Sequence, residues 1–191
     1  FTVTTNAFVN TYNGGNYWSF GSSITYGSGT DIIVTKFSSD GNSLIGSTYV
    51  GGSGNDGINE SGSGAYNNSG LCYFYADEYR GEITIDNQNN CYVASTSKST
   101  DFPTLNANQT INNGFQDAVV FSLNEDLSTL RWSSYLGGSQ NDAAYSIQLN
   151  SLNEIYITGG TMSNDLLTTS NVIYPNYNGG VDGFISKYNS S

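Results

Sequence analysis

The sequence predicts an all-β protein made of β-propeller-type repeats, each built from short antiparallel strands. Residues 31–56 reappear without a gap at residues 117–142, with 11 of 26 positions identical, and a third copy begins at Asp182. Short runs of apolar residues alternate with polar ones, whereas no stretch carries apolar residues at helical spacing over three turns. A spacing of 86 residues between Asp31 and Asp117, and of 65 from there to Asp182, is typical of propeller blades or a related β-array.

Each repeat presents the same elements in the same order. A lead-in ending in Tyr-Asn-Gly-Gly precedes an aspartate and an apolar strand, and a polar turn leads to a second strand that ends in Gly-Gly-Ser-x-Asn-Asp. Two further strands follow, separated by another turn. The predicted strands centre on residues 32–37, 83–85, 91–93, 119–123, 155–157 and 184–185. The turns between them are Ser-Asp-Gly-Asn, Asp-Asn-Gln-Asn-Asn and Asn-Ser-Leu-Asn, which are sequences that favour chain reversal.

The repeats divide the chain into three parts of one structural unit. Residues 1–103 form a first repeat with insertions at 16–30 and 57–80, residues 104–168 form a second repeat, and residues 169–191 form a partial third. A closed propeller needs about four to eight blades, so two full repeats and a partial one do not close a ring. We therefore expect a segment of a larger array, completed by further repeats or by other protein chains, in a ring, an oligomer or a filament.

These residues resemble the SBBP repeat, a family of bacterial β-propeller repeats. The resemblance rests on TYVGGSGND at 48–56, IDNQNNCYVASTSKSTDFP at 85–103, DAVVFSL at 117–123 and YLGGSQND at 135–142. The second copy departs from the pattern at residues 165–167, Asp-Leu-Leu, where the first has Asp-Phe-Pro. The resemblance implies a secreted or surface-displayed protein, often large and multidomain, and it implies no activity.

Charge and composition exclude several classes of function. A net charge of −11 with only five Lys or Arg argues against nucleic acid and anionic membrane surfaces, and no apolar run is long enough to insert into a membrane. The chain has no histidine, which excludes Ser-His-Asp and Cys-His catalysis. Asp77, Glu78 and Glu82 could in principle serve a glycoside-acting enzyme, but a solvated acidic loop is the favoured interpretation. We therefore expect a protein that is not an enzyme.

Repeated carboxylates are the clearest candidates for a site shared by the repeats. Asp56 and Asp142 both follow Gly-Gly-Ser-x-Asn. Such residues most often accept hydrogen bonds from backbone N–H groups at turns. Ca²⁺ bound by Asp, Asn and main-chain carbonyls is the alternative, and it is the less favoured one because no calcium-loop motif is present.

Aromatic residues that do not recur between repeats are concentrated in the two insertions. The first holds Tyr17, Trp18, Phe20 and Tyr26, and the second holds Tyr66, Tyr73, Phe74, Tyr75 and Tyr79. They could form a surface that stacks on glycans or docks a protein, or they could cover a core edge or an exposed strand edge. The candidates for binding are Tyr17, Trp18, Tyr26, Tyr73, Phe74 and Tyr75.

The two cysteines of the chain could form a disulfide. Cys72 and Cys91 are a candidate disulfide that would pin the second insertion to the strand at 91, with two separate thiols as the alternative. Together these observations predict a non-enzymatic extracellular or cell-surface module, structural or adhesive, that mediates protein–protein assembly without a cofactor. A carbohydrate-binding module is the second hypothesis, and a glycoside-acting enzyme is a distant third.

Overall fold

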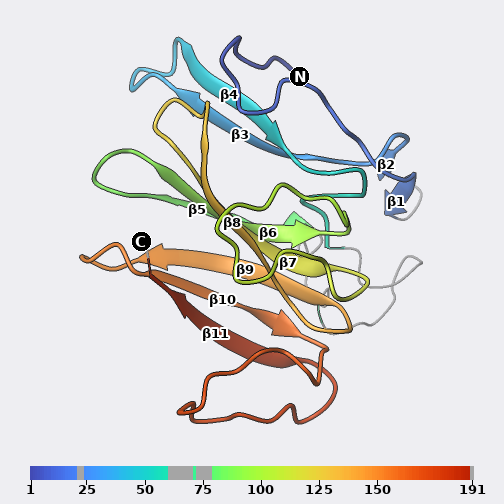
Figure 1. Ribbon diagram of the computed structural model, residues 1–191. Coiled ribbons are helices and arrows are strands. Elements are labelled where there is room, and N and C mark those ends of the chain that lie inside the picture. The colour runs from blue at the N-terminus through green and yellow to red at the C-terminus, as the bar shows by residue number, and fades with distance from the viewer. Residues whose placement is uncertain (21–23, 60–70, 72–78, 190–191) are drawn as a thin grey trace.

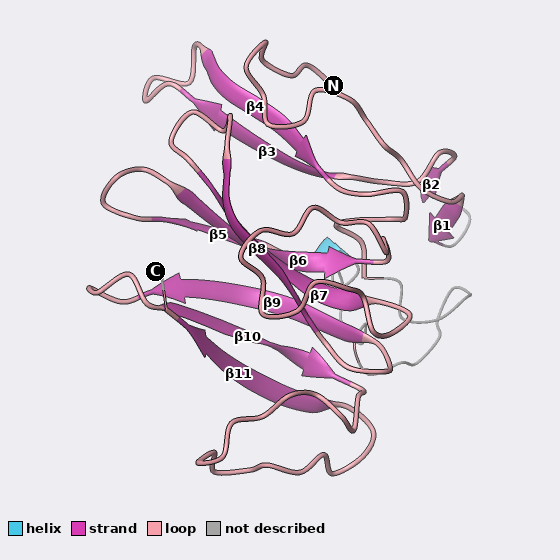
Figure 2. Ribbon diagram, viewed as in Figure 1, coloured by secondary structure: helices cyan, strands magenta, loops and turns pink. Residues whose placement is uncertain are grey.

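The protein is all-β in the computed structural model, which describes residues 1–20, 24–59, 71 and 79–189 (Figures 1 and 2). The strands within these residues are β1 (Trp18–Phe20), β2 (Ile24–Tyr26), β3 (Ile32–Phe37), β4 (Leu44–Val50), β5 (Glu82–Ile85), β6 (Cys91–Ser97), β7 (Asp117–Leu123), β8 (Leu130–Leu136), β9 (Asp142–Leu149), β10 (Ile155–Thr161) and β11 (Asp182–Tyr188). β1 and β2 form a separate hairpin. The others form three open antiparallel sheets, which we call sheet I (β3–β4), sheet II (β5–β6–β7–β8) and sheet III (β9–β10–β11).

The three sheets are stacked face to face in chain order, from sheet I at the top of Figure 1 to sheet III at the bottom. One apolar cluster joins sheet I to sheet II, and a second joins sheet II to sheet III. Strand β7 contributes to both because its side chains alternate between the two faces of the sheet. Phe121 lies in the first cluster and Val120 in the second, and both are buried. The near-continuous apolar sequence of β7 is thus explained by burial on both sides.

The strands recur at the positions that the sequence repeat predicts. β7 begins at Asp117 and β11 at Asp182, and β3 begins one residue after Asp31. β3 pairs with β4 as β7 pairs with β8, and β10 pairs with β11 as β6 pairs with β7. The expected all-β, repeat-like fold is therefore confirmed.

Side chains of Asx residues hold the predicted turns. The Oδ1 atom of Asp86 accepts hydrogen bonds from the backbone N–H groups of Gln88 (2.8 Å) and Asn90 (2.9 Å). Asn150 has the equivalent role between β9 and β10, where its Oδ1 atom accepts from Leu152 N at 2.9 Å. A side chain that replaces a missing backbone partner makes these Asn- and Asp-rich sequences good turns.

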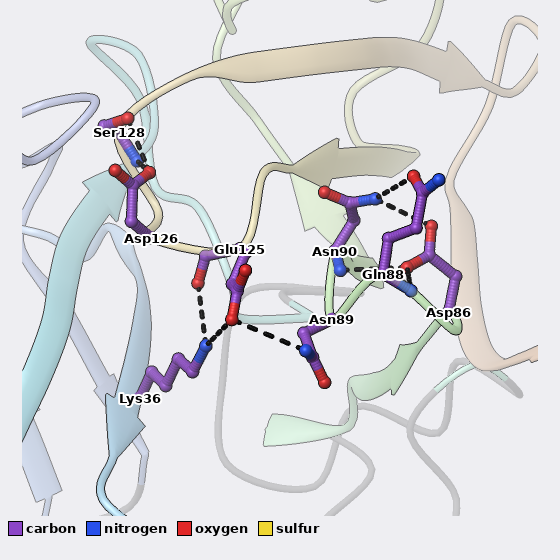
Figure 3. Close-up of polar contacts among 8 residues, drawn as sticks. All are labelled: Lys36, Asp86, Gln88, Asn89, Asn90, Glu125, Asp126 and Ser128. Atoms are coloured by element: carbon purple, nitrogen blue, oxygen red, sulfur yellow. Dashed lines mark hydrogen bonds and ion pairs between the residues drawn. The ribbon is translucent and has the colours of Figure 1, made fainter.

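A polar cluster joins strand β3 of sheet I to two turns of sheet II. The Nζ atom of Lys36, on β3, lies 3.2 Å from Oε1 of Glu125 in the β7–β8 turn, and Asn89 donates to the same oxygen at 3.4 Å (Figure 3). Because these side chains are largely exposed, the contact fixes the relative position of the turns more than it adds stability.

The structure identifies the lead-in of the second repeat. Val9 N donates to Thr48 Oγ1 at 2.9 Å, and Gln109 N makes the matching bond to Ser134 Oγ at 3.1 Å. Residues 4–9 and 105–109 therefore lie along the outer edges of β4 and β8 in the same way. Sequence comparison alone missed residues 105–109 as a copy of the lead-in.

The second insertion begins at the position where the equivalent strand of sheet III, β9, has a β-bulge. In sheet III, Ala144 pairs with Gly159 and Ser146 with Thr158, so Tyr145 is the extra residue of a bulge in β9. The equivalent of Tyr145 in sheet II is Asn59, after which the extra residues begin, whereas the sequence placed the start at residue 57. The N–H of Gly57 still bonds to the carbonyl oxygen of Thr96, as the shared strand requires. A bulge already interrupts strand pairing, so added residues disturb the sheet least there.

Candidate functional site

The carboxylate of Asp56 joins the end of sheet I to the end of β6. Its Oδ2 atom accepts hydrogen bonds from Gly52 N at 2.8 Å and from Ser99 Oγ at 2.7 Å, and Ser97 Oγ donates to its Oδ1 atom. Asp56 is fully buried. The Gly-Gly-Ser-x-Asn-Asp motif therefore places an acceptor where the turn and the following sheet both supply donors.

Asp142 repeats this junction between sheets II and III. Its Oδ2 atom accepts from Gly138 N at 2.7 Å and from Ser163 Oγ at 2.7 Å, and the residue is also fully buried. Both aspartates thus take the turn-stabilising role that the sequence favoured for them.

The buried aspartates of the two junctions have raised pKa values. Desolvation raises the pKa of Asp56 to about 6, and the charge of Asp31 adds to this effect. Burial likewise raises the pKa of Asp117 to about 6, with a contribution from the charge of Asp142. The pKa values of Asp31 and Asp142 are raised as well, again mainly by burial. Each junction therefore holds a pair of carboxylates that become protonated more readily than exposed ones.

No group of three or more His, Cys, Asp or Glu side chains that could hold a metal ion occurs within the described residues. The Ca²⁺ site considered at Asp56 and Asp142 stays a prediction. The donors that the structure shows around both carboxylates are N–H and O–H groups, and the Oδ1 atom of Asp142 has no hydrogen-bond partner among the described residues.

A third aspartate of each junction was not singled out by the sequence reasoning. Asp101 Oδ1 accepts from Ser53 N at 2.7 Å and from Ser53 Oγ at 3.0 Å. Asp165 Oδ1 makes the same pair of bonds with Ser139, at 2.8 and 3.1 Å. The signal was present in the sequence, because Asp101 and Asp165 lie at the same 64-residue offset as the strands before them.

Aromatic residues from the two insertions meet in space. The rings of Trp18 and Tyr26, which are paired across the β1–β2 hairpin, have centroids 5.7 Å apart. Tyr79, from the end of the second insertion, packs edge-on against Trp18 at 6.2 Å. Tyr17 points elsewhere, with 66% of its surface exposed. Tyr73, Phe74 and Tyr75 lie outside the described residues, as do Asp77, Glu78 and Cys72.

A cleft of about 510 Å³ lies beside this aromatic cluster. Tyr26 and Tyr79 line it together with β3 on one side and β5 and β6 on the other. Ile33 and Ile83 are among its apolar lining residues and are 44% and 53% exposed. The cleft is the part of the described chain where exposed apolar side chains, aromatic rings and an open strand edge come together, and it is our candidate binding site.

Two further candidate residues, Cys91 and Glu82, contact neighbouring strands and sheets. Cys91 is a free cysteine buried in the cluster between sheets I and II, and burial raises the pKa of its thiol. Because Cys72 is not described, the disulfide stays a prediction. Glu82, considered as a catalytic acid, instead accepts a 2.7 Å hydrogen bond from Ile147 N and another from the Ser146 hydroxyl. These bonds tie β5 to β9.

Comparison of the chain with models of known protein families gives no match, and no curated protein matches it closely enough to count as a relative. In the part of the chain that the structure describes, no helix has the length and apolar character needed to cross a membrane.

Proposed function

We propose that this chain is a non-enzymatic structural or adhesive module of an extracellular or cell-surface protein, built from SBBP-like propeller blades that mediate protein–protein assembly. The three sheets would be consecutive blades or parts of blades. What supports the proposal is that the outer faces of sheets I and III are equivalent to faces that are buried inside the same chain.

The two interfaces within the chain use the same pair of faces. Val34 of sheet I packs toward sheet II, and its equivalent in sheet II, Val120, packs toward sheet III. On the opposite surface of each interface, Val119 of sheet II faces sheet I, and its equivalent Phe184 of sheet III faces sheet II. Both residues are buried. Each sheet therefore presents one face to the next sheet and a different face to the sheet before it.

On the two outer sheets, the face that has no neighbouring sheet among the described residues is exposed. On sheet III, Ile185 is 79% exposed, whereas its equivalent Val120 is 1% exposed. On sheet I, Phe37 is 59% exposed, whereas its equivalent Leu123 is fully buried. Exposed apolar positions with buried equivalents mark an interaction surface. The outer face of sheet III fits the outer face of sheet I of another copy, or of a further repeat, in a head-to-tail contact.

The absence of histidine from the whole sequence and the structural role of Glu82 favour a binding role over catalysis. The net charge of −11 favours protein partners over nucleic acid.

Two single variants test this assembly by light scattering after size exclusion. We expect the unmodified chain to associate as its concentration rises to about 100 µM, a range in which weak contacts form. Ile185→Asp and Phe37→Asp should each give monomers, because each removes one of the two complementary faces. An equimolar mixture of the two variants should form a dimer and stop there, since each partner keeps one intact face.

Leu152→Asp is the matched control, because Leu152 is 74% exposed in the β9–β10 turn and its equivalent in sheet II, Gln88, is exposed as well. It should associate like the unmodified chain. An unmodified chain that stays monomeric throughout this range would overturn head-to-tail assembly.

A further inference from the structure

Strand β3 has an open edge where its equivalent in sheet II is paired. β7 lies between β6 and β8, but among the described strands β3 pairs only with β4. The backbone N–H and C=O groups of an unpaired edge are available to another strand. Here the open edge is one wall of the cleft, because residues 31–35 line it.

The side of the cleft opposite β3, which we call its floor, can pack against an added strand. Ile83 of β5 and Val93 of β6 are directly paired across sheet II and both line the cleft. They give it an apolar floor, and Tyr26 and Tyr79 also contribute to its lining. An apolar surface next to unpaired backbone groups is the arrangement that binds extended peptides by strand addition.

Sheet II shows the geometry that such a peptide would adopt. β6 pairs with β7 over seven residues, from Cys91 opposite Leu123 to Ser97 opposite Asp117. At the 86-residue offset between β7 and β3, the same pairing would run along residues 31–37. The occupant would be antiparallel to β3, and its side chains would point alternately to the two faces of sheet I.

Charge restricts the occupant further. Asp31 and Glu82 line the cleft, and the protein carries a net charge of −11. The segment should therefore be neutral or basic, because an acidic one would be repelled.

We propose that the cleft between β3 and β5 binds an extended, neutral or basic polypeptide segment, which adds to sheet I as an antiparallel strand beside β3. The inference does not depend on the stacking of sheets, because it uses the edge of β3 and not the outer face of sheet I.

A peptide with the sequence of residues 90–99, carrying Cys91→Ser, is the probe, because it reproduces the strand that fills the equivalent edge. It is labelled with a fluorophore and titrated with the Ile185→Asp chain, so that stacking cannot contribute to the signal. We expect saturable binding in fluorescence anisotropy. The same peptide with alternate backbone amides N-methylated should not bind, since it keeps the side chains but loses the donors of strand pairing.

Two protein variants then locate the site. Ile83→Lys, in the cleft floor, should weaken binding at least about tenfold, because it removes apolar contact and repels a basic peptide. Ile85→Lys makes the same change on the same strand at a residue that does not line the cleft, and should bind as before. Both residues are more than half exposed, so both variants should fold.

Any of three results would overturn the proposal. The first is the absence of peptide binding, and the second is equal binding by the N-methylated peptide. The third is that an oligosaccharide from a glycan array binds and is lost in Tyr79→Ala while the peptide does not bind, which would assign the cleft to carbohydrate.

Discussion

The phenolic hydroxyl of Tyr135 donates a hydrogen bond of 2.7 Å to the carbonyl oxygen of Ser99. The phenolic oxygen of Tyr135 also accepts a 3.0 Å bond from the backbone N–H of Phe102. Tyr135 is fully buried, and burial raises its pKa to about 12. One side chain on β8 therefore satisfies two backbone groups of the segment that follows β6.

Tyr135→Phe should lower the free energy of unfolding by about 1–3 kcal/mol, because the buried N–H of Phe102 loses its partner and the buried carbonyl of Ser99 keeps only the longer bond of 3.4 Å from Asn112. Urea denaturation measures the loss. Tyr49→Phe is the control, since Tyr49 is the equivalent residue of sheet I and its hydroxyl bonds to none of the described residues. Its ring packs instead against Phe1 and Tyr12, with centroids 5.7 and 5.6 Å away. A loss in Tyr49→Phe as large as in Tyr135→Phe would contradict this account.

Acidification from pH 7.5 to pH 5 should stabilise the protein. The pKa values of Asp56 and Asp117 are about 6 in the folded state, against 3.8 for the unfolded chain. Between these values the folded state binds more protons, so its stability rises as the pH falls, by about 1.4 kcal/mol for each group between pH 7.5 and pH 5. Urea midpoints at the two pH values measure this, and a lower midpoint at pH 5 would contradict it.

Asp117→Asn provides the control for this pH dependence, because it removes one of the two titrating groups and should reduce the difference between the two midpoints. Below about pH 4, further acidification should instead lower the stability of the protein. Hydrogen bonds from Ser139 lower the pKa of Asp165, and a hydrogen bond from Lys187 lowers that of Glu154, so both groups contribute stability that is lost when they are protonated.

Tyr79→Ala should expose Trp18 to solvent. The edge-on ring contact joins the end of the second insertion to the β1–β2 hairpin, and such contacts are worth about 0.5–1.5 kcal/mol. In a Trp132→Phe background, acrylamide should quench Trp18 fluorescence more strongly after the substitution. Tyr17→Ala should change quenching little, because Tyr17 is mostly exposed. Equal effects of the two substitutions would show that the two insertions are not joined through Tyr79.

Much of the fold could be predicted from the sequence because its signals are local. The alternation of side chains along β7, and the Asx residues at 86 and 150, act over a few neighbouring residues. The 26-residue repeat added the order of the strands, and it marked Asp56 and Asp142 as equivalent before their partners were known.

Tertiary structure alone decided which distant groups meet. The bonds of residues 105–109 along β8 are seen only in the structure, although the Thr-x-Asn-Ala sequence at 104–107 repeats that at 4–7 and could have marked this lead-in. Trp18 and Tyr79 are 61 residues apart, and no local pattern indicates that their rings touch. The open edge of β3 likewise depends on which strands pair across the sheets. Strand formation follows from local alternation, whereas contacts between sheets depend on how the whole chain packs, and it is these contacts that create the cleft.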